Sequence, residues 1–171
     1  RVVKYTHDAY DQDPVLIAGD ENGNYGNAND LNLLYHPRGM VVASDGTVYV
    51  SDWENNRVMK FTEGTAEGEV ILNQRVRGGL YLDDNDALYI ATESGGYIYK
   101  KEPGKTIEQL TTENLSSPTG LLVDSSGGVY VYDRGNNRIV YYAKGQTNSP
   151  EVISGDFNVG NNSYYGGAQL Q

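Results

Sequence analysis

The chain has 171 residues, 38% of them hydrophobic, which is enough for one domain with a buried core. It carries 13 Lys plus Arg against 23 Asp plus Glu, and the formal net charge of -10 disfavours binding to the phosphate backbone of nucleic acids. Cysteine is absent, which excludes disulfides and thiolate metal sites, and no stretch approaches the roughly 20 apolar residues of a membrane-spanning helix, so we predict neither a nucleic-acid partner nor membrane insertion.

Two short strands are predicted within residues 1–19. Residues 1–5 and 15–17 are rich in β-branched side chains, which favour strands. They match residues 138–142 and the run that ends at Ile153, and both of these lie in the second half of a repeated unit. We therefore interpret residues 1–19 as half of such a unit.

A linker rich in Asp, Asn and Gly is predicted over residues 20–33. Asp20, Asn22 and Asn24 alternate as the oxygen ligands of a calcium loop do. However, Tyr25 stands where an EF-hand loop needs glycine, and the twelfth position holds leucine instead of glutamate. We therefore favour a loop between repeats, and calcium binding is the alternative.

One sequence unit then occurs three times. Each copy contains four short runs of β-branched and aromatic residues broken by Gly, Asn and Asp, and Tyr49, Tyr89 and Tyr130 are spaced by 40 and 41 residues. Four strands in about 40–45 residues are typical of a β-propeller blade, whereas the alternative, a β-sandwich, has no reason to repeat at fixed spacing. The three predicted blades are residues 34–73, 74–113 and 114–155.

An acidic residue and an arginine are five positions apart in two of the copies, as Asp52 with Arg57 and as Asp133 with Arg138. Each pair flanks a turn that contains two asparagines, and a charge-assisted hydrogen bond can close such a turn. Because the pair recurs, we interpret it as structural rather than catalytic.

The repeated motif resembles the NHL repeat. It consists of Pro-x-Gly, an apolar strand, Asp-Gly or Gly-Gly, a Val-Tyr-Val strand ending near an aspartate, and Asn-Asn-Arg. The first and third copies carry it strongly, and the middle copy is degenerate, with Thr92 in place of the aspartate and Tyr97 in place of the arginine. The resemblance implies an all-β propeller with varied roles across the family.

Three complete four-stranded blades and half a blade make an incomplete ring. Residues 156–171 form another predicted linker, and the chain stops where the next Pro-x-Gly strand would begin. Open strand edges remain unless first and last blades meet. We expect a part of a six-bladed ring, or a ring that a second copy completes; a compact four-bladed ring is the alternative.

A second acidic group, Asp83, Asp84 and Asp86, lies at a predicted turn between strands. We predict a solvated turn, with weak calcium binding as the alternative. The chain has 2 histidines, His7 and His36, in different repeats, which makes a zinc site within this chain improbable.

Tyrosine is abundant, with 15 residues against 2 Phe and 1 Trp. Loop tyrosines are good contact residues for proteins or glycans. The sequons that begin at Asn114 and Asn161 are candidate glycosylation sites, and together with the acidic, tyrosine-rich composition they favour an extracellular protein. The candidate interaction residues in predicted loops are Tyr25, Tyr35, Tyr164 and Tyr165.

The sequence favours a non-enzymatic propeller scaffold that binds a protein or glycan, or that associates with itself into a larger extracellular assembly or filament. The alternative is part of a lactonase-type or lyase-type propeller enzyme, with a metal in the central channel held by blades outside this chain. We expect no cofactor and assign no catalytic residue.

Overall fold

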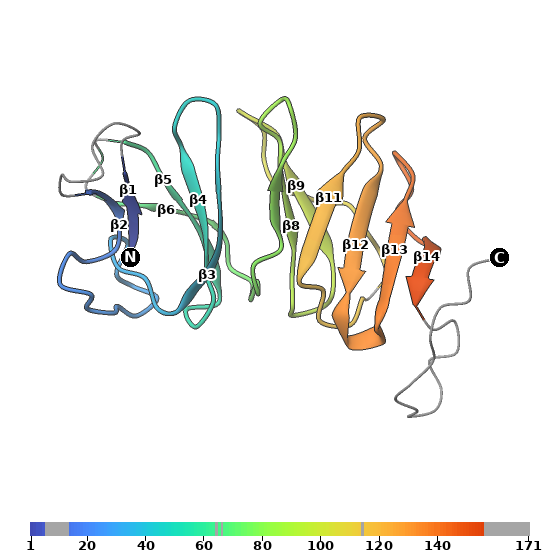
Figure 1. Ribbon diagram of the computed structural model, residues 1–171, viewed down its shortest axis with the longest axis horizontal. Helices are drawn as coiled ribbons and strands as arrows, with labels where there is room; N and C mark the ends of the chain where they lie inside the picture. The colour runs from blue at the N-terminus through green and yellow to red at the C-terminus, as the bar shows by residue number, and fades with distance from the viewer. Residues whose placement is uncertain (6–13, 64, 66, 114, 156–171) are drawn as a thin grey trace.

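The computed structural model describes residues 1–5, 14–63, 65, 67–113 and 115–155, and this part of the chain is all-β (Figure 1). It forms one two-stranded and three four-stranded antiparallel sheets, and its one short helix is η1 (Arg134–Asn136). No helix in these ranges is long and apolar enough to cross a membrane. The prediction of an all-β fold built from four-stranded units is confirmed.

In every sheet, strands that follow one another along the chain lie side by side. The half unit comprises β1 (Val2–Lys4) and β2 (Val15–Ala18). The first full sheet comprises β3 (Pro37–Val42), β4 (Val48–Asp52), β5 (Arg57–Phe61) and β6 (Glu69–Leu72). The second comprises β7 (Leu80–Leu82), β8 (Leu88–Ala91), β9 (Ile98–Lys101) and β10 (Glu108–Gln109). The third comprises β11 (Gly120–Val123), β12 (Val129–Asp133), β13 (Arg138–Tyr142) and β14 (Glu151–Gly155).

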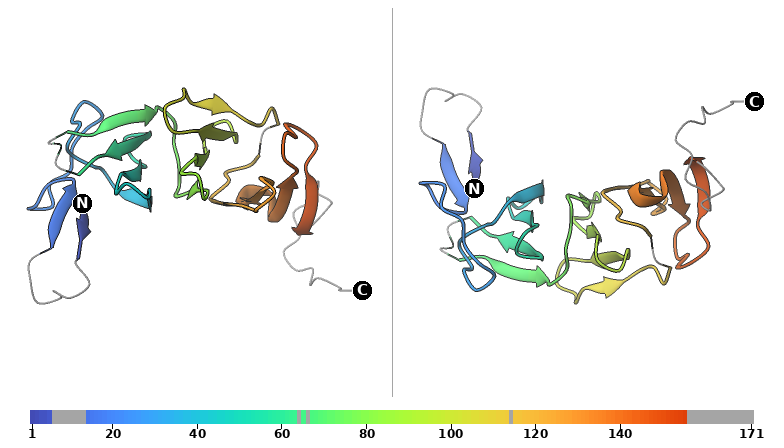
Figure 2. Two further views of the ribbon diagram at one scale, coloured as in Figure 1. Left: turned by 90° about the horizontal axis from the view of Figure 1, so that it is seen from above. Right: turned by 90° about the horizontal axis from the view of Figure 1, so that it is seen from below.

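The sheets are arranged like propeller blades. They follow one another along an arc, with β3, β7 and β11 at its inner side and β6 and β10 at its outer side (Figure 2). Strand β7 contacts both β3 and β11, so the inner strands of successive sheets are neighbours. We call the end of the sheets where these inner strands begin, and where β4, β8 and β12 end, the lower rim, as it lies at the bottom of Figure 1.

The turns of each blade follow from local sequence. In the first blade, Gly46 adopts a φ of 85° in the turn between β3 and β4, a conformation that costs glycine little. Asn56 and Asn137 adopt φ values of 53° and 50° before the third strand of their blades, and asparagine tolerates this left-handed region better than most residues. These turns set the register in which Asp52 faces Arg57 and Asp133 faces Arg138.

Apolar residues between adjacent sheets form three cores. Because both faces of the second sheet are covered, all four residues of β8 are buried. The core between the half unit and the first sheet includes Val2, Ala18, Leu34, Val50, Met59 and Phe61. The core between the first and second sheets includes Val58, Val76, Leu80, Leu88 and Ile90. The core between the second and third sheets includes Tyr89, Ala91, Leu121, Val131 and Val140.

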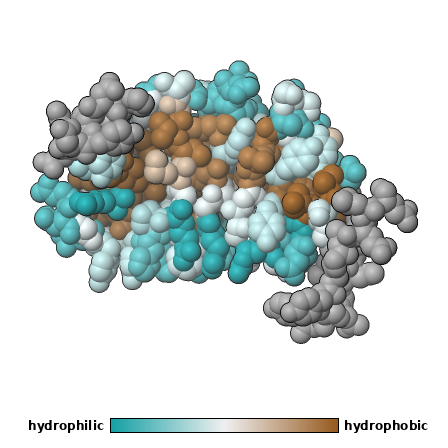
Figure 3. Space-filling view, viewed as in Figure 1, coloured by the Kyte–Doolittle hydropathy of each residue, from teal (hydrophilic) through white to brown (hydrophobic). Residues whose placement is uncertain are grey.

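The third sheet is apolar on both faces, but only one face is covered within the described chain. Tyr132 and Ile139 are cross-strand partners on the other face and are 47% and 38% exposed. Leu122 and Ile153 are also exposed. Figure 3 shows further hydrophobic surface on the concave side of the arc, above a hydrophilic lower rim.

Candidate functional site

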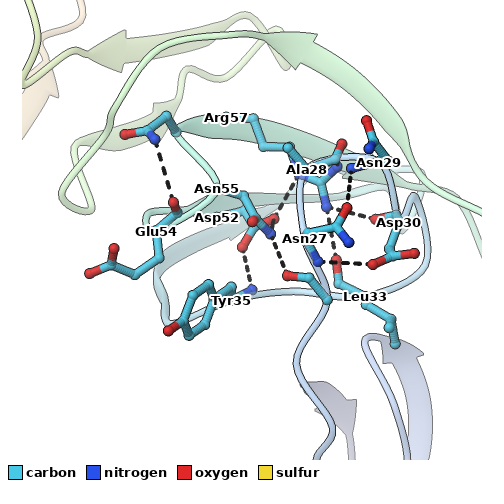
Figure 4. Close-up of polar contacts among 12 residues, drawn as sticks. Asn27, Ala28, Asn29, Asp30, Leu33, Tyr35, Asp52, Glu54, Asn55 and Arg57 are labelled. Carbon is cyan, nitrogen blue, oxygen red and sulfur yellow. Dashed lines mark hydrogen bonds and ion pairs between the residues drawn. The ribbon is translucent and has the colours of Figure 1, made fainter.

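The repeated Asp–Arg pair of the first blade is a buried ion pair (Figure 4). Arg57 Nε donates to Asp52 Oδ2 at 2.7 Å, and both side chains are at most 1% exposed. The other carboxylate oxygen of Asp52 accepts the backbone N–H of Tyr35 at 2.6 Å, and Asn55 Nδ2 donates to Asp52 Oδ2 at 2.8 Å. Both carboxylate oxygens of Asp52 therefore accept hydrogen bonds within its own blade.

Arg57 also holds the preceding linker against the blade. Its terminal nitrogens donate to the backbone oxygens of Ala28, Asp30 and Leu33 at 2.8–2.9 Å, and Asn55 donates to the oxygen of Gly26 at 3.1 Å. The side chains of the motif thus fix the path of residues 26–33, a role that goes beyond the turn closure predicted from sequence.

The third blade repeats the pair with less burial. Arg138 Nε donates to Asp133 Oδ2 at 2.7 Å, Ser116 N donates to Asp133 Oδ1 at 2.6 Å, and Asn136 completes the set. Asp133 is buried, but the side chain of Arg138 is 23% exposed. In the second blade, Thr92 occupies the position of the aspartate and exchanges hydrogen bonds with the backbone of Tyr97.

A tryptophan surrounded by arginines lies on the lower rim between the first two blades. Trp53 follows β4, Glu93 follows β8 at the equivalent place in the repeat, and Arg38, Arg75 and Arg77 lie within or before the first inner strand of their blades. The guanidinium carbons lie 4.0 Å (Arg38), 4.2 Å (Arg75) and 5.1 Å (Arg77) from the Trp53 ring centroid, within the range of cation–π attraction. We call these five residues the Trp53 cluster.

Glu93 anchors this cluster. Its carboxylate accepts Trp53 Nε1 at 2.9 Å and Arg77 Nε at 3.1 Å, and Arg75 Nε lies 3.6 Å away. Burial raises the pKa of Glu93, but the hydrogen bond from Trp53 and the charge of Arg77 outweigh it, so the pKa lies below its ordinary value. The Glu93 carboxylate is therefore ionised and fixes the tryptophan ring.

The tyrosine stack, formed by Tyr25, Tyr35 and His36, adjoins the cluster on the same rim. The rings of Tyr25 and Tyr35 are stacked, with their centroids 4.8 Å apart. The ring of His36 is tilted by 39° against that of Tyr35, and these two centroids are also 4.8 Å apart. Tyr25 is 72% exposed, and Tyr35 is held through its backbone by Asp52 and by Glu54 N. The structure thus brings together two of the four predicted interaction tyrosines; Tyr164 and Tyr165 lie outside the described residues, as do Asn114 and Asn161.

The candidate calcium ligands stabilise turns instead of converging on one point. Asp20 Oδ1 accepts the backbone N–H groups of Asn22 and Asn24, and Asp83 Oδ1 accepts those of Asn85 and Ala87. The carboxylate of Asp86 accepts hydrogen bonds from the backbone N–H and the hydroxyl of Ser44 in the first blade.

The acidic turns therefore do not assemble a metal site in the described ranges. The Asp84 side chain forms no hydrogen bond or ion pair with another residue that the structure describes. No group of three or more His, Cys, Asp or Glu side chains suited to a metal occurs among those residues. Calcium binding stays an untested prediction.

Sequence reasoning did not identify the Trp53 cluster, although the repeat contained a signal for it. Arg38 lies inside Pro-x-Gly, Arg75 and Arg77 precede the corresponding glycines of the second blade, and Trp53 and Glu93 both follow the second strand. Equivalent repeat positions of adjacent blades lie on one rim, so alignment of the units could have placed these residues together.

The sequence matches the family model of the NHL repeat at residues 34–61 and 115–142. No curated protein matches it significantly. The structure resembles a streptogramin B lyase, with 20% identity and a TM-score of 0.51, over 66% of this chain and 38% of that one. It resembles virginiamycin B lyase from Staphylococcus aureus, with 15% identity and a TM-score of 0.56, over 69% and 41%.

A nidogen/laminin complex gives a similar match, with 20% identity and a TM-score of 0.56, over 71% of this chain and 49% of that one. The chain thus spans less than half the length of these structures. At these identities the likeness establishes the fold, and the predicted propeller and its repeats are confirmed.

Proposed function

We propose that this chain, which carries NHL repeats in an array of propeller blades, is a non-enzymatic scaffold that binds a partner protein through its lower rim. The observation that carries the proposal is the gathering of tyrosine, tryptophan and arginine on one rim, with Tyr25 and Arg38 exposed and Trp53 half-buried. These residue types are enriched among the few residues that dominate binding energy at protein interfaces. Each of them combines a large apolar area with directed hydrogen bonds.

The rim is also held in place before any partner arrives. Asp52 and Arg57 fix the linker that carries Tyr25, and Glu93 fixes Trp53. Preorganised contact residues lose less conformational entropy on binding. The nidogen/laminin complex has the same fold, which supports a protein partner for this propeller without identifying it.

Photo-cross-linking of the full chain tests this function. A benzoylphenylalanine placed at Tyr25 should yield discrete protein adducts in the native extracellular medium, and Trp53→Ala should reduce their yield at least about fivefold. The matched control carries the cross-linker at Lys105, in an exposed turn outside the lower rim. Equal adducts from both positions, or no effect of Trp53→Ala in a folded protein, would contradict a binding rim.

An extracellular location belongs to the same proposal. The sequons that begin at Asn114 and Asn161 support it, and glycan removal that lowers the mass of the native protein would agree with it. A native protein without glycan and confined to the cytosol would contradict it.

Self-association is proposed through the uncovered face of the third sheet. Ile139 stands at the repeat position of Val58, which another blade buries completely. We expect the chain to form dimers whose sedimentation mass depends on concentration, and Ile139→Asp to weaken them at least about tenfold. A monomer at all concentrations would contradict this contact.

A lyase is the second candidate, because two of the similar structures are a streptogramin B lyase and a virginiamycin B lyase. A metal would then be held with the help of further blades. Quinupristin accompanies a virginiamycin B lyase in one of the similar structures, so it is the probe for this candidate. The native full-length protein is incubated with quinupristin, and the mixture is separated by liquid chromatography before mass spectrometry. Loss of quinupristin in proportion to the amount of protein would overturn the non-enzymatic proposal.

A further inference from the structure

An open hollow on the lower rim is lined by His36, Pro37, Arg38 and Arg77. It adjoins the Trp53 ring, since both arginines stand over that ring. These side chains are not part of the hydrophobic cores. Arg38 and His36 are exposed, and the three cores consist of other residues. The hollow is therefore a candidate binding feature rather than a by-product of packing.

The charges around the hollow are unequal. Arg75 and Arg77 face the carboxylates of Glu54 and Glu93, at 3.1–3.8 Å. Arg38 has no carboxylate within 4.0 Å among the residues that the structure describes, although it lies in the same cluster. Three guanidinium groups and two carboxylates leave one positive charge here, on a chain whose net charge is -10. A local positive centre on an acidic protein attracts an anionic group.

Arg38 is oriented for such a group. Its guanidinium carbon lies 4.0 Å from the Trp53 ring centroid, and Glu93 holds that ring through Trp53 Nε1. Contact with the ring limits the motion of the guanidinium, and its N–H groups can still meet a planar acceptor with two oxygens.

We propose that this hollow binds a carboxylate side chain of an acidic peptide segment, with Arg38 as its main donor and Arg77 and His36 beside it. The inference rests on the proposed protein-binding function and names the chemistry of the partner. A carboxylate fits better than a polyanion, because the net charge of -10 repels long sulfated or phosphorylated chains while a single carboxylate needs only the local centre. The faces of Trp53 and Pro37 can contact the aliphatic stem of such a residue.

The fluorescence of Trp53 reports on the hollow directly, because the chain contains only 1 Trp. We would titrate the full chain with a blocked hexapeptide containing two glutamates and one aspartate, and with its counterpart containing glutamine and asparagine. The acidic peptide should change the emission in a saturable way, and the neutral peptide should bind at least about tenfold more weakly. Arg38→Gln should weaken binding of the acidic peptide by about tenfold or more.

Arg134→Gln is the matched control. Arg134 occupies the repeat position of Trp53 in the third blade, is exposed, and changes the net charge equally when replaced. It should leave peptide affinity within about twofold of the original protein. Arg38 is exposed, so Arg38→Gln should leave the fold intact. An unchanged thermal unfolding midpoint checks that this variant is folded.

Iodide quenching gives a second measurement that needs no peptide. The quenching constant of iodide relative to neutral acrylamide should fall in Arg38→Gln and not in Arg134→Gln. Equal affinity for the two peptides, or an unchanged affinity in Arg38→Gln, would overturn the proposal. If inorganic sulfate or a sulfated disaccharide bound more tightly than the acidic peptide, the proposal that the ligand is a peptide carboxylate would be wrong. Adducts at Tyr25 that persist when peptide binding fails would leave the scaffold function standing and remove only this site.

Discussion

The first and third blades contain the same motif in different surroundings. Asp52, Asn55 and Arg57 make the same internal hydrogen bonds as Asp133, Asn136 and Arg138, at closely similar distances. Arg57 is nevertheless fully buried and also binds three backbone oxygens, whereas the side chain of Arg138 is 23% exposed. We therefore expect the contribution of the motif to stability to depend on the segment that covers it.

The covering segments differ in length. Residues 19–36 separate β2 from β3, whereas residues 110–119 separate β10 from β11. The longer linker has enough chain to pass over the guanidinium of Arg57 and present its carbonyl oxygens. The first blade is also more buried than the third on one face of its sheet. Val58 is completely buried, whereas the equivalent Ile139 is 38% exposed.

The largest expected effect is that of Arg57→Ala. It would leave the buried Asp52 carboxylate without its counter-charge and three linker carbonyls without a donor, and we expect a loss of about 3–5 kcal/mol in the free energy of unfolding. Urea denaturation of the full chain measures it. Arg57→Lys should recover little, because one ammonium cannot reproduce the planar fork. A loss equal to that of Arg138→Ala would show that the linker contacts contribute nothing.

Val58→Ala should have the next largest effect. It removes two carbons from a fully buried position and leaves a cavity between the first two blades, so we expect a loss of about 2 kcal/mol in unfolding free energy. The matched change Ile139→Ala should cost about 0.5 kcal/mol in the monomer, because that side chain is partly exposed. Similar losses at the two positions would mean that the third sheet face is covered in solution.

Arg138→Ala should lower the free energy of unfolding by about 1.5 kcal/mol, the value of one hydrogen bond to a charged group. Water can reach the exposed part of this site, and Asp133 keeps its bonds from Ser116 and Asn136. A loss as large as that of Arg57→Ala would contradict the link between burial of the motif and its contribution to stability.

The smallest effect concerns pH and the Trp53 cluster. The pKa of Glu93 is lowered in the folded state, so its stabilising contribution is present above its unfolded pKa of about 4.5 and is lost as the pH falls through the lower folded value. Glu93→Gln should therefore reduce the fall in unfolding free energy from about pH 5 to about pH 3. If the pH dependence of the unfolding free energy were unchanged in this variant, the ion pairs of Glu93 would not contribute to stability. Glu108→Gln serves as the control, because Glu108 is exposed.

Much of the fold could be predicted because it is written in local patterns. Alternating Val and Tyr predict strands, and Asp-Gly and Asn-Asn predict the turns that the structure contains. The pairing of Asp52 with Arg57 was also accessible, since hairpin register places residues five apart across the turn. The acidic clusters were harder to interpret, because the same Asp and Asn residues can bind calcium or cap backbone N–H groups, and only coordinates show which atoms they contact.

The Trp53 cluster was missed for another reason. Its members come from the start of β3, the segment before β7 and the residues after β4 and β8, and none of these segments contains a recognisable ligand-binding motif. The tyrosine stack was predicted only as separate loop tyrosines, without the contact between Tyr25 and Tyr35.

The sequence by itself determined the repeating unit, its strands and turns, and the ion pair within each complete motif, because all of these depend on residues close together in the chain. Tertiary structure decided which arginine of two identical motifs is buried, which sheet face is covered, and that three arginines surround one tryptophan. Burial and long-range electrostatics depend on which segments pack together, and a repeat that is nearly uniform in sequence does not specify its neighbours.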